Sequence, residues 1–407
     1  MAQRRILFLT QVLPYPLDAG AKVRAYYMLR HLAERHRVTL ASLVRPADRA
    51  DAVGHLAGFC EAVHAIPIHR SAFRDAAALL TSLATGLPAL ILRDRSAAFR
   101  DLIGRLVAAT SFDAIHVDQI KTAQHVARVE RLPRLIDLHN VYHEMIAGLA
   151  RLTKSPGRMR LLQREARTMA RYERRACSDF NEILAVTDGD AAQLRAMIGP
   201  ARPVTAIPIC VDPSEAPRIP INADSRALLS LGAMFYPPNV DGVLWFVREI
   251  LPLVRREVPD VRLRIVGPRP DRSILRAADG NAAIQVVGYA EDAAPGMAAS
   301  AALVVPLRAG GGMRVKILDA MARGLPVVST RLGAEGIAVT DGENILLADG
   351  AEAFAQAAVR LLRDVDLRRR LAQNARQLIE SRYDWRRRYD AVDAVYERLF
   401  AAGDCSP

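Results

Sequence analysis

The stretch from Ala301 to Thr330, AALVVPLRAGGGMRVKILDAMARGLPVVST, limits the possible folds of this chain more than any other. The short apolar run Ala301–Pro306 predicts a strand that is buried on both faces of a parallel sheet. Three glycines, Gly310–Gly312, come next, and a helical pattern then covers Met313–Arg323. A glycine and a proline end that helix, and Val327–Ser329 predicts the following strand.

Two cations, Arg314 and Lys316, stand at the start of the predicted helix. A helix N-terminus has unpaired N–H groups and a partial positive charge, so cations are disfavoured there unless an anion binds. Gly311 and Gly312 let the backbone approach such an anion. Lys316 and Asp319 share a helix face, which fits a diphosphate followed by ribose hydroxyls. The alternative is an exposed Lys316–Asp319 pair that contributes little stability.

Length and charge narrow the classes of function. A chain of 407 residues is too long for one core and indicates two domains. Its net charge of +12 indicates an anionic partner, such as a nucleotide, a phosphorylated lipid, a membrane surface or nucleic acid.

The cysteines and the apolar runs bear on the compartment. Four cysteines, far apart and without a CxxC pair, favour a reduced cytoplasm and argue against a zinc site. The apolar run Ile6–Leu9 is expected to be a strand rather than a signal peptide, and no uncharged run is long enough for a transmembrane helix.

The N-terminal half opens with a second βα unit. Ile6–Thr10 predicts a strand, Ala21–Glu34 a helix and Val38–Val44 the next strand, with a Pro-rich loop ending at Gly20. Such a loop lies at the carboxyl end of its strand, where open α/β sheets bind ligands. Arg24 follows close behind, so cations again stand near a helix start. The alternative is an ordinary βα connection, and no GxGxxG dinucleotide fingerprint is present.

Leu135–Glu144, LIDLHNVYHE, holds the densest acid/base cluster of this half. It follows a predicted strand, so Asp137, His139 and Asn140 are expected at the carboxyl end of that strand. His139 could donate to a sugar hydroxyl or a phosphate oxygen, or could be a hydrogen-bonded structural histidine. The histidine spacing matches no metal-binding pattern, so a metal is not expected.

Two segments have more than one interpretation. For the apolar Phe73–Leu92 we favour packing in the core over an exposed surface that touches a lipid-linked acceptor or a membrane. Arg158–Arg175, with seven arginines and two glutamates, predicts an amphipathic basic helix. We favour a helix that is core-facing on one side and solvated on the other over contact with anionic lipid. Nucleic acid fits the charge, but no motif supports it.

Pro208–Ala223 contains four prolines and is the best candidate for a linker. Strand and helix patterns alternate on both sides of it. The expected fold is therefore α/β, with two doubly wound, Rossmann-like domains that face a shared cleft.

At this point a family resemblance emerges. The chain resembles the retaining glycosyltransferases of the GT-B fold, of the family 4 type, and is similar to the sugar transferases of bacterial exopolysaccharide clusters. The motifs that carry the resemblance are YPPN (Tyr236–Asn239) with Trp245, Pro306–Thr330, LGAEGI (Leu332–Ile337), DGENILLAD (Asp341–Asp349), and, more loosely, Asp18–Gly20, Arg24 and DLHN (Asp137–Asn140).

The resemblance implies a domain at residues 1–207 that binds the acceptor and a domain at 208–383 that binds a nucleotide-sugar donor, with a last helix, 384–401, that packs back on the first domain. It implies neither metal nor cofactor beyond the donor. The residues assigned are catalytic His139, Arg314 and Lys316; donor-binding Gly20, Gly232, Gly311, Gly312, Met313, Asp319, Glu335 and Gly336; and, on the acceptor side, Arg24 and Asn140.

Two departures from the family pattern stand out. The family usually has two glutamates eight positions apart, and here Gly311 and Asp319 take those places. The usual Arg and Lys of the first C-terminal βα loop are not evident in Gly232–Asn239, so Arg314 and Lys316 are expected to supply that charge.

The implied function is transfer of a sugar from a nucleoside diphosphate sugar to a saccharide, expected to be lipid-linked, in exopolysaccharide biosynthesis. The expected location is the cytoplasm, with possible peripheral contact with the inner-membrane surface and no nucleic-acid partner. The alternatives are a nucleotide-sugar epimerase of similar fold and a non-catalytic subunit that binds nucleotide sugar.

Overall fold

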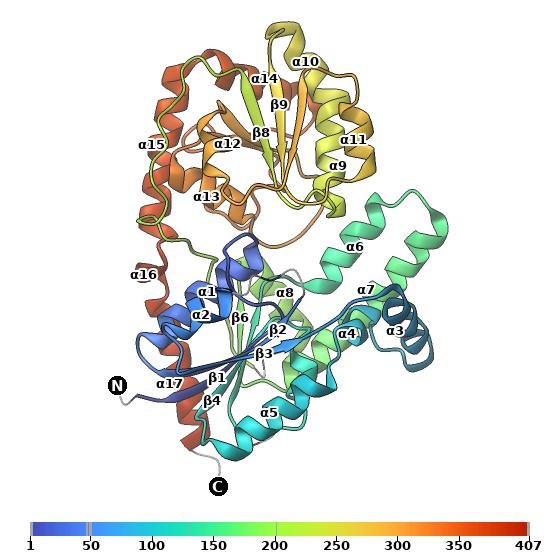
Figure 1. Cartoon of the computed structure of the whole chain (residues 1–407), viewed down its shortest axis with the longest axis vertical. Coiled ribbons are helices and arrows are strands. Elements are labelled where there is room, and N and C mark those ends of the chain that lie inside the picture. The colour runs from blue at the N-terminus through green and yellow to red at the C-terminus, as the bar shows by residue number, and fades with distance from the viewer. Residues whose placement is uncertain (1–2, 46–47, 49–50, 130, 201, 405–407) are drawn as a thin grey trace. The chain divides into compact units, whose positions relative to one another are not determined.

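Two parallel β-sheets organise the chain, and each belongs to its own compact unit (Figure 1). Unit 1 comprises Met1–Ile209 and Arg388–Pro407, and unit 2 comprises Cys210–Arg387. The structure is a computed structural model, and it describes residues 3–45, 48, 51–129, 131–200 and 202–404. The α/β class with two parallel sheets, expected from the sequence, is confirmed.

The sheet of unit 1 has seven parallel strands in the order β3-β2-β1-β4-β5-β6-β7. The central strands are almost fully buried, as expected of a sheet covered on both faces. The strands are β1 (Arg5–Thr10), β2 (Arg37–Val44), β3 (Ala62–Pro67), β4 (Ala114–Asp118), β5 (Arg134–Leu138), β6 (Glu182–Ala185) and β7 (Val204–Ala206).

Helices connect these strands, and the C-terminal helix packs with them in unit 1. They are α1 (Gly20–Ala33), α2 (Asp51–Ala57), α3 (Ala72–Thr85), α4 (Ala89–Arg93), α5 (Ala97–Ala109), the 3₁₀ turn η1 (Ala123–His125), α6 (Tyr142–Leu152), α7 (Pro156–Ser178), α8 (Asp188–Ile198) and α17 (Asp390–Asp404).

The sheet of unit 2 has six parallel strands in the order β10-β9-β8-β11-β12-β13. They are β8 (Ala227–Leu231), β9 (Arg262–Val266), β10 (Ile284–Gly288), β11 (Ala302–Val305), β12 (Val327–Ser329) and β13 (Leu346–Leu347). The helical segments are α9 (Pro237–Trp245), η2 (Phe246–Ile250), α10 (Leu251–Glu257), α11 (Arg272–Ala278), α12 (Ala294–Ala298), α13 (Val315–Arg323), α14 (Ala351–Arg363), α15 (Val365–Arg382) and α16 (Trp385–Arg388).

One helix of unit 2 begins later than predicted, and another helical segment is interrupted by a π-helical turn. The helix predicted from Met313 begins at Val315, with Arg314 as its N-cap, because the glycine loop extends further than the apolar pattern suggests. The long helix after β8 is interrupted by the π-helical turn η2. Pro252 follows that turn and lacks the N–H that a regular helix would use, which explains the interruption.

The Pro-rich stretch after residue 208 is not the free linker that the sequence suggested. Arg376 of α15 donates to the carbonyls of Pro213 and Ala216, both at 2.8 Å. Arg368, also on α15, donates to the carbonyls of Asn222 and Ala223. The stretch is therefore bound to α15 along most of its length.

The preferred interpretation of Phe73–Leu92 as core was wrong for four of its large apolar residues, whereas Ile91 is buried in the core of unit 1. Phe73 is 82% exposed, Leu80 66%, Leu83 55% and Leu87 38%. The inward side of α3 is formed by small residues, Ala78 and Ser82, so the apolar stripe points away from the core. Among the described residues, no helix has both the length and the apolar content needed to span a bilayer.

Candidate functional site

The two units each place a polar loop cluster where their strand order reverses. In unit 2 the reversal lies between β8 and β11, which pair in parallel although β9 and β10 come between them in sequence. The loops that leave these two strands diverge to opposite sides of the sheet. Such a switch point, at the carboxyl ends of the strands, is where open α/β sheets bind ligands.

Lys316 joins these two loops. It stands in the first turn of α13, behind β11, yet its Nζ donates to the Leu231 carbonyl at the end of β8 at 2.8 Å. The same Nζ donates to Asn239 Oδ1, in the first turn of α9, at 3.1 Å. The ammonium therefore sits in the first βα loop of unit 2, where the sequence itself places no lysine.

Gly232 makes room for that ammonium. A Cβ at this position would lie 2.9 Å from Asn239 Nδ2 and 3.2 Å from Lys316 Nζ, and its φ is +145°. Both the space and the backbone conformation exclude a side chain here. Lys316 can therefore occupy this position because residue 232 is a glycine. This gives a physical reason for the assignment of Gly232 to the donor site.

Arg314 folds back over the glycine loop. Its Nη1 donates to the Gly311 carbonyl at 2.6 Å and also to the Gly312 carbonyl. Gly310 and Gly312 have φ of +120° and +73°, conformations that favour glycine. The guanidinium therefore shapes the loop that precedes α13. Arg314 and Lys316 both turn inward onto the strand-end loops.

Burial dominates the electrostatics of Lys316. Loss of solvent lowers the pKa of its ammonium to about 7, and the nearby charge of Arg314 adds to the effect. Among the described residues no carboxylate lies within ion-pair distance of Lys316. An anionic ligand would supply the missing counter-charge.

The remaining residues assigned to the donor have less specific surroundings. Asp319 accepts from Arg323 Nε at 2.9 Å, so its carboxylate pairs one turn onward rather than with Lys316. Met313 is buried. Glu335 and Gly336 lie exposed in the turn after β12, where Gly336 has a φ of +78°.

Asn239 was missed as a site residue. It lies in the YPPN motif, but only the fold brings it to Lys316. Its Nδ2 donates to the Ala233 carbonyl at 3.0 Å, which fixes the amide so that Oδ1 faces the ammonium. A polar residue directly after the two prolines of a helix start was the signal available in the sequence.

In unit 1 the polar cluster is created by strand register. β4 and β5 are neighbours, and Asp118 pairs directly with Asp137 across them. His139 is two residues beyond Asp137 and so points to the same face. Its Nε2 lies 2.8 Å from Asp118 Oδ1, at ion-pair distance but without the alignment of a hydrogen bond.

The acidic neighbours of His139 favour the protonated form of its imidazole. Burial by itself lowers the pKa of the imidazole, but the ion pair with Asp118 and the charge of Asp137 outweigh it, so the net pKa is raised. The residue is 4% exposed, and its Nδ1 has no hydrogen-bond partner among the described residues. A buried polar atom without a partner indicates a place for a ligand atom.

Arg24 is placed differently from the expected acceptor contact. Its side chain is fully buried and makes a two-pronged ion pair with Asp137, at 2.9 and 3.1 Å. It also donates to the carbonyls of Ile207 and Pro208 and lies 3.4 Å from Tyr389 Oη. Because these groups occupy its donors inside the core, Arg24 is a positioning residue that supports Asp137.

The other two N-terminal assignments lie at the same strand ends. Gly20 is the first residue of α1, after the loop that follows β1. Asn140 comes directly after His139 and is half-buried. Both therefore lie at the carboxyl edge of the sheet, near its reversal between β1 and β4.

Asp118, Asp137 and His139 bring three potential metal-ligand atoms within 4.8 Å of one another. Their charges are already balanced, because Arg24 pairs with Asp137 and His139 with Asp118. A guanidinium that holds both oxygens of one acid opposes a further cation. The cluster fits an ion-pair network better than a metal site.

Family comparison agrees with this geometry. Residues 225–364 match the family described as "Glycosyl transferases group 1". Residues 19–215 match the family described as "Glycosyltransferase Family 4". The first match lies within unit 2, and the second lies almost wholly in unit 1.

Individual relatives share parts of the chain. A 172-residue part is 26% identical to the "Uncharacterized 44.6 kDa protein in cps region" of Klebsiella pneumoniae, covering 40% of this chain and 44% of that protein. A 184-residue part is 34% identical to the phosphatidyl-myo-inositol mannosyltransferase of Mycobacterium leprae, covering 44% of this chain and 48% of that protein. The matched parts thus span less than half the length of these curated relatives.

A solved structure extends the likeness to nearly the whole chain. HepE of Anabaena, in complex with UDP and glucose, matches with a TM-score of 0.69 over 97% of this chain and 100% of that one, at 15% identity. This match shows the GT-B fold. Both units of the chain therefore contain a region that matches a glycosyltransferase family.

Proposed function

We propose that the protein transfers a sugar from a nucleoside diphosphate sugar to a lipid-linked saccharide, with retention of anomeric configuration and without a metal, in exopolysaccharide biosynthesis. Lys316 at the switch point of unit 2 carries the proposal: its ammonium has no carboxylate partner among the residues that the structure describes, and it is held at the ends of β8 and β11. The relatives named above, one from a cps region and one a phosphatidyl-myo-inositol mannosyltransferase, support a saccharide or lipid-borne acceptor.

In this proposal the bond between the anomeric carbon and the diphosphate breaks, the acceptor oxygen takes its place, and the acceptor hydroxyl loses its proton. Negative charge gathers on the leaving diphosphate. Lys316 and the amides at the start of α13 stabilise that charge. Arg314 holds the glycine loop in position next to the diphosphate. His139 contacts the transferring sugar through its unpartnered Nδ1.

The proposed location is the cytoplasm, with peripheral contact at the membrane that carries the lipid-linked acceptor. Cys60 and Cys177 are free and buried, which supports a reducing compartment. Burial raises the pKa of the Cys60 thiol to about 12, so this thiol is unreactive at neutral pH.

The donor site is tested by calorimetric titration of UDP, GDP and ADP into the wild type, Lys316→Ala and Arg276→Ala. Arg276 is an exposed cation on α11 of the same unit and is the matched control. We expect one nucleotide to bind, Lys316→Ala to lose about 10- to 100-fold in affinity, and Arg276→Ala to match the wild type. Equal binding by Lys316→Ala would overturn this assignment.

The reaction is tested with the sugar derivatives of whichever nucleotide binds and with extracted lipid-linked saccharides. Turnover of Lys316→Ala should fall by about 10²–10³. Metal independence predicts unchanged turnover in EDTA; loss that Mg²⁺ restores would contradict it. If the enzyme converts the donor to an isomer when no acceptor is present, the protein is instead an epimerase. Retention is tested by NMR, which identifies the anomeric configuration of the transferred sugar in the product.

A further inference from the structure

Helix α3 presents an apolar stripe to solvent. Phe73, Leu80 and Leu83 follow one another at helical spacing and are 82%, 66% and 55% exposed. Leu87, which lies just beyond the end of the helix, is 38% exposed. Ala76, Ala77 and Ala84 are exposed on the same side. Single exposed apolar residues are common, but a continuous stripe along a helix marks an interaction surface.

The helix that carries this stripe is fully formed. Ser71 caps its start by accepting from the Arg74 amide at 3.2 Å, and Gly86 ends it with a φ of +72°. Figure 1 shows α3 beside α4 and α7 in unit 1. The stripe is therefore a defined surface rather than the side of a frayed segment.

Beneath α3 lies the basic helix α7, whose acidic residues both point inward. Glu165 accepts from the amides of Ala89 and Leu90, and Glu173 accepts from those of Tyr142 and His143. Both glutamates are buried. The charge that α7 shows to solvent therefore comes from arginine alone.

The arginine side of α7 faces α3. Arg164 donates to Ser82 Oγ at 3.0 Å and to the Ser82 carbonyl at 2.6 Å. Five exposed arginines share its side of the helix by the 100° spacing of residues. They are Arg160, Arg167, Arg171, Arg174 and Arg175. None of these five makes an ion pair with any residue that the structure describes.

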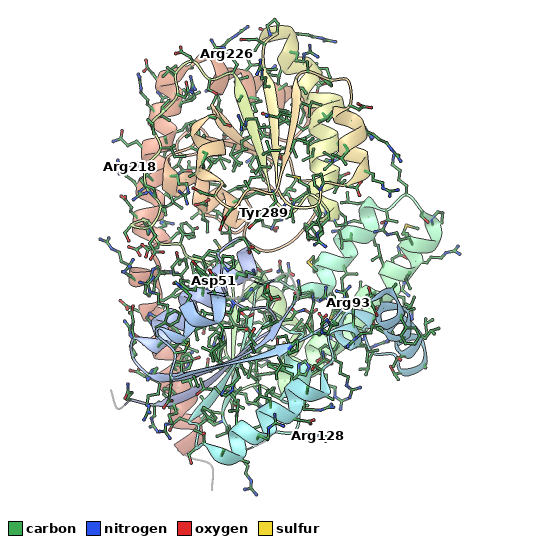
Figure 2. The ribbon with its side chains drawn as sticks, in the orientation of Figure 1. Asp51, Arg93, Arg128, Arg218, Arg226 and Tyr289 are labelled. Atoms are coloured by element: carbon green, nitrogen blue, oxygen red, sulfur yellow. The ribbon has the colours of Figure 1, made fainter. Side chains whose placement is uncertain are left out.

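The acid nearest the stripe is already paired. Asp75 lies on the inner side of α3, with an oxygen 3.9 Å from Nε of Arg93. Arg93, labelled in Figure 2, ends α4. The apolar side chains of α3 thus point away from the core, and α7, which carries the exposed arginines, contacts the opposite side of α3 through Arg164 and Ser82.

We propose that the apolar stripe of α3 and the arginine stripe of α7 together form a docking surface for a bilayer that contains anionic phospholipid. An amphipathic helix buries its apolar face at the boundary between headgroups and acyl chains, and adjacent cations attract anionic headgroups. A second copy of this chain fits the surface poorly, because a two-fold contact would bring the arginine stripes together. This inference deepens the membrane contact of the proposed function and rests on it only for the nature of the acceptor.

Vesicle flotation of the full chain tests the surface, without donor or acceptor. Vesicles of phosphatidylcholine alone are compared with vesicles of phosphatidylcholine and phosphatidylglycerol. The wild type should bind the second and not the first. Leu80→Ser/Leu83→Ser should weaken binding by at least about tenfold. Leu275→Ser/Tyr289→Ser, which changes two residues of unit 2 that are 48% and 58% exposed, should leave it unchanged.

Charge is tested in the same assay. Arg167→Gln/Arg171→Gln should weaken binding by about fivefold per arginine, and added salt should reproduce the loss. The matched control is Arg255→Gln/Arg256→Gln, an exposed pair on α10 of unit 2. All four variants change exposed residues, so their thermal unfolding should match that of the wild type.

Three results would overturn the proposal. They are no binding to the anionic vesicles, undiminished binding by Leu80→Ser/Leu83→Ser, and equal binding to both vesicle types. A wild-type dimer in lipid-free sedimentation that this variant converts to monomer would assign the stripe to self-association instead. Because the assay contains no nucleotide sugar, a failure here is distinct from a failure of sugar transfer.

Discussion

Lys316 is a cation for which the described residues of unit 2 supply carbonyl and amide oxygens but no carboxylate. Such a group tolerates burial poorly, and burial lowers the pKa of its ammonium to about 7. The site is therefore incomplete in charge until an anion binds. This single residue links the stability of the loop to the chemistry that we propose.

The first prediction is that donor binding takes up a proton at Lys316. In the free protein the ammonium loses its proton as pH rises through about 7. A bound diphosphate favours the charged form and raises that pKa. Between the two pKa values affinity should fall by about tenfold per pH unit, while below the lower value it should be constant. Calorimetry of a nucleotide sugar in buffers of different ionisation enthalpy measures the uptake.

Lys316→Arg is the control for this prediction, because a guanidinium stays charged throughout this range. Its binding should show neither proton uptake nor pH dependence near 7. Proton uptake that persists in Lys316→Arg would assign the titration to another group.

The second prediction concerns Gly232. Gly232→Ala should abolish nucleotide binding, because the new Cβ meets both Asn239 and Lys316. Gly280→Ala is the matched control: Gly280 also has a positive φ, of +68°, but a Cβ there meets nothing within 4 Å. It tests a Cβ at a positive φ without the contacts to Asn239 and Lys316. Nucleotide affinity is measured by calorimetry. Equal affinity in the two variants would argue against the claim that a side chain at position 232 disturbs the Lys316 ammonium.

At the scale of elements, α15 holds the Pro-rich stretch in unit 2. Arg376→Ala removes the donor to the carbonyls of Pro213, Ala216 and Ala322. Leaving them without partners should lower the free energy of unfolding by about 2–3 kcal/mol. Arg369→Ala, an exposed arginine of the same helix, should change it by less than about 0.5 kcal/mol. Urea unfolding compares them, and similar midpoints would refute the role of Arg376.

Elements set by local pattern could be predicted from the sequence. The strand, glycine turn and helix around residues 301–330 follow from apolar runs and glycines, and the structure reproduces them with a helix start two residues later. Helix α3 shows where pattern alone was insufficient. From the sequence, its apolar stripe looks like a side that packs in the core. The structure shows that Ala78 and Ser82 face inward instead, so the stripe is exposed to solvent.

The candidate site could be predicted in part, for the same reason. His139 and Asp137 were found because they follow a strand, but Asp118 enters only through the pairing of β4 with β5. The reach of Lys316 to Leu231 joins residues far apart in sequence and depends on β8 and β11 being neighbours. No local pattern encodes that strand order.

At the scale of the whole molecule, unit 1 depends on the end of the chain. Helix α17 contributes the buried side chains of Val392, Tyr396 and Leu399, and Tyr389, just before the helix, is also buried. Tyr396 Oη lies 2.8 Å from His116 Nδ1. A chain that stops after Arg387 should lose about 10 kcal/mol from unit 1, comparable to the whole stability of a domain.

Hydrogen exchange measures the outcome of this truncation. Amides of β4 should lose protection, while those of β8 should keep it, because the contacts of Asp212 with Trp385 and Arg386 remain within unit 2. Full protection of β4 in the truncated chain would contradict the dependence.

The buried guanidinium of Arg24 carries a consequence for biosynthesis. It contacts Asp137, the carbonyls of Ile207 and Pro208, and the Tyr389 hydroxyl. A ribosome delivers those partners over almost the entire length of translation. The Tyr389 contact of Arg24 therefore forms only after the domain made second already has all its residues. Nascent chains would pass through a stage in which the later half is mature and the earlier half is still open to chaperones.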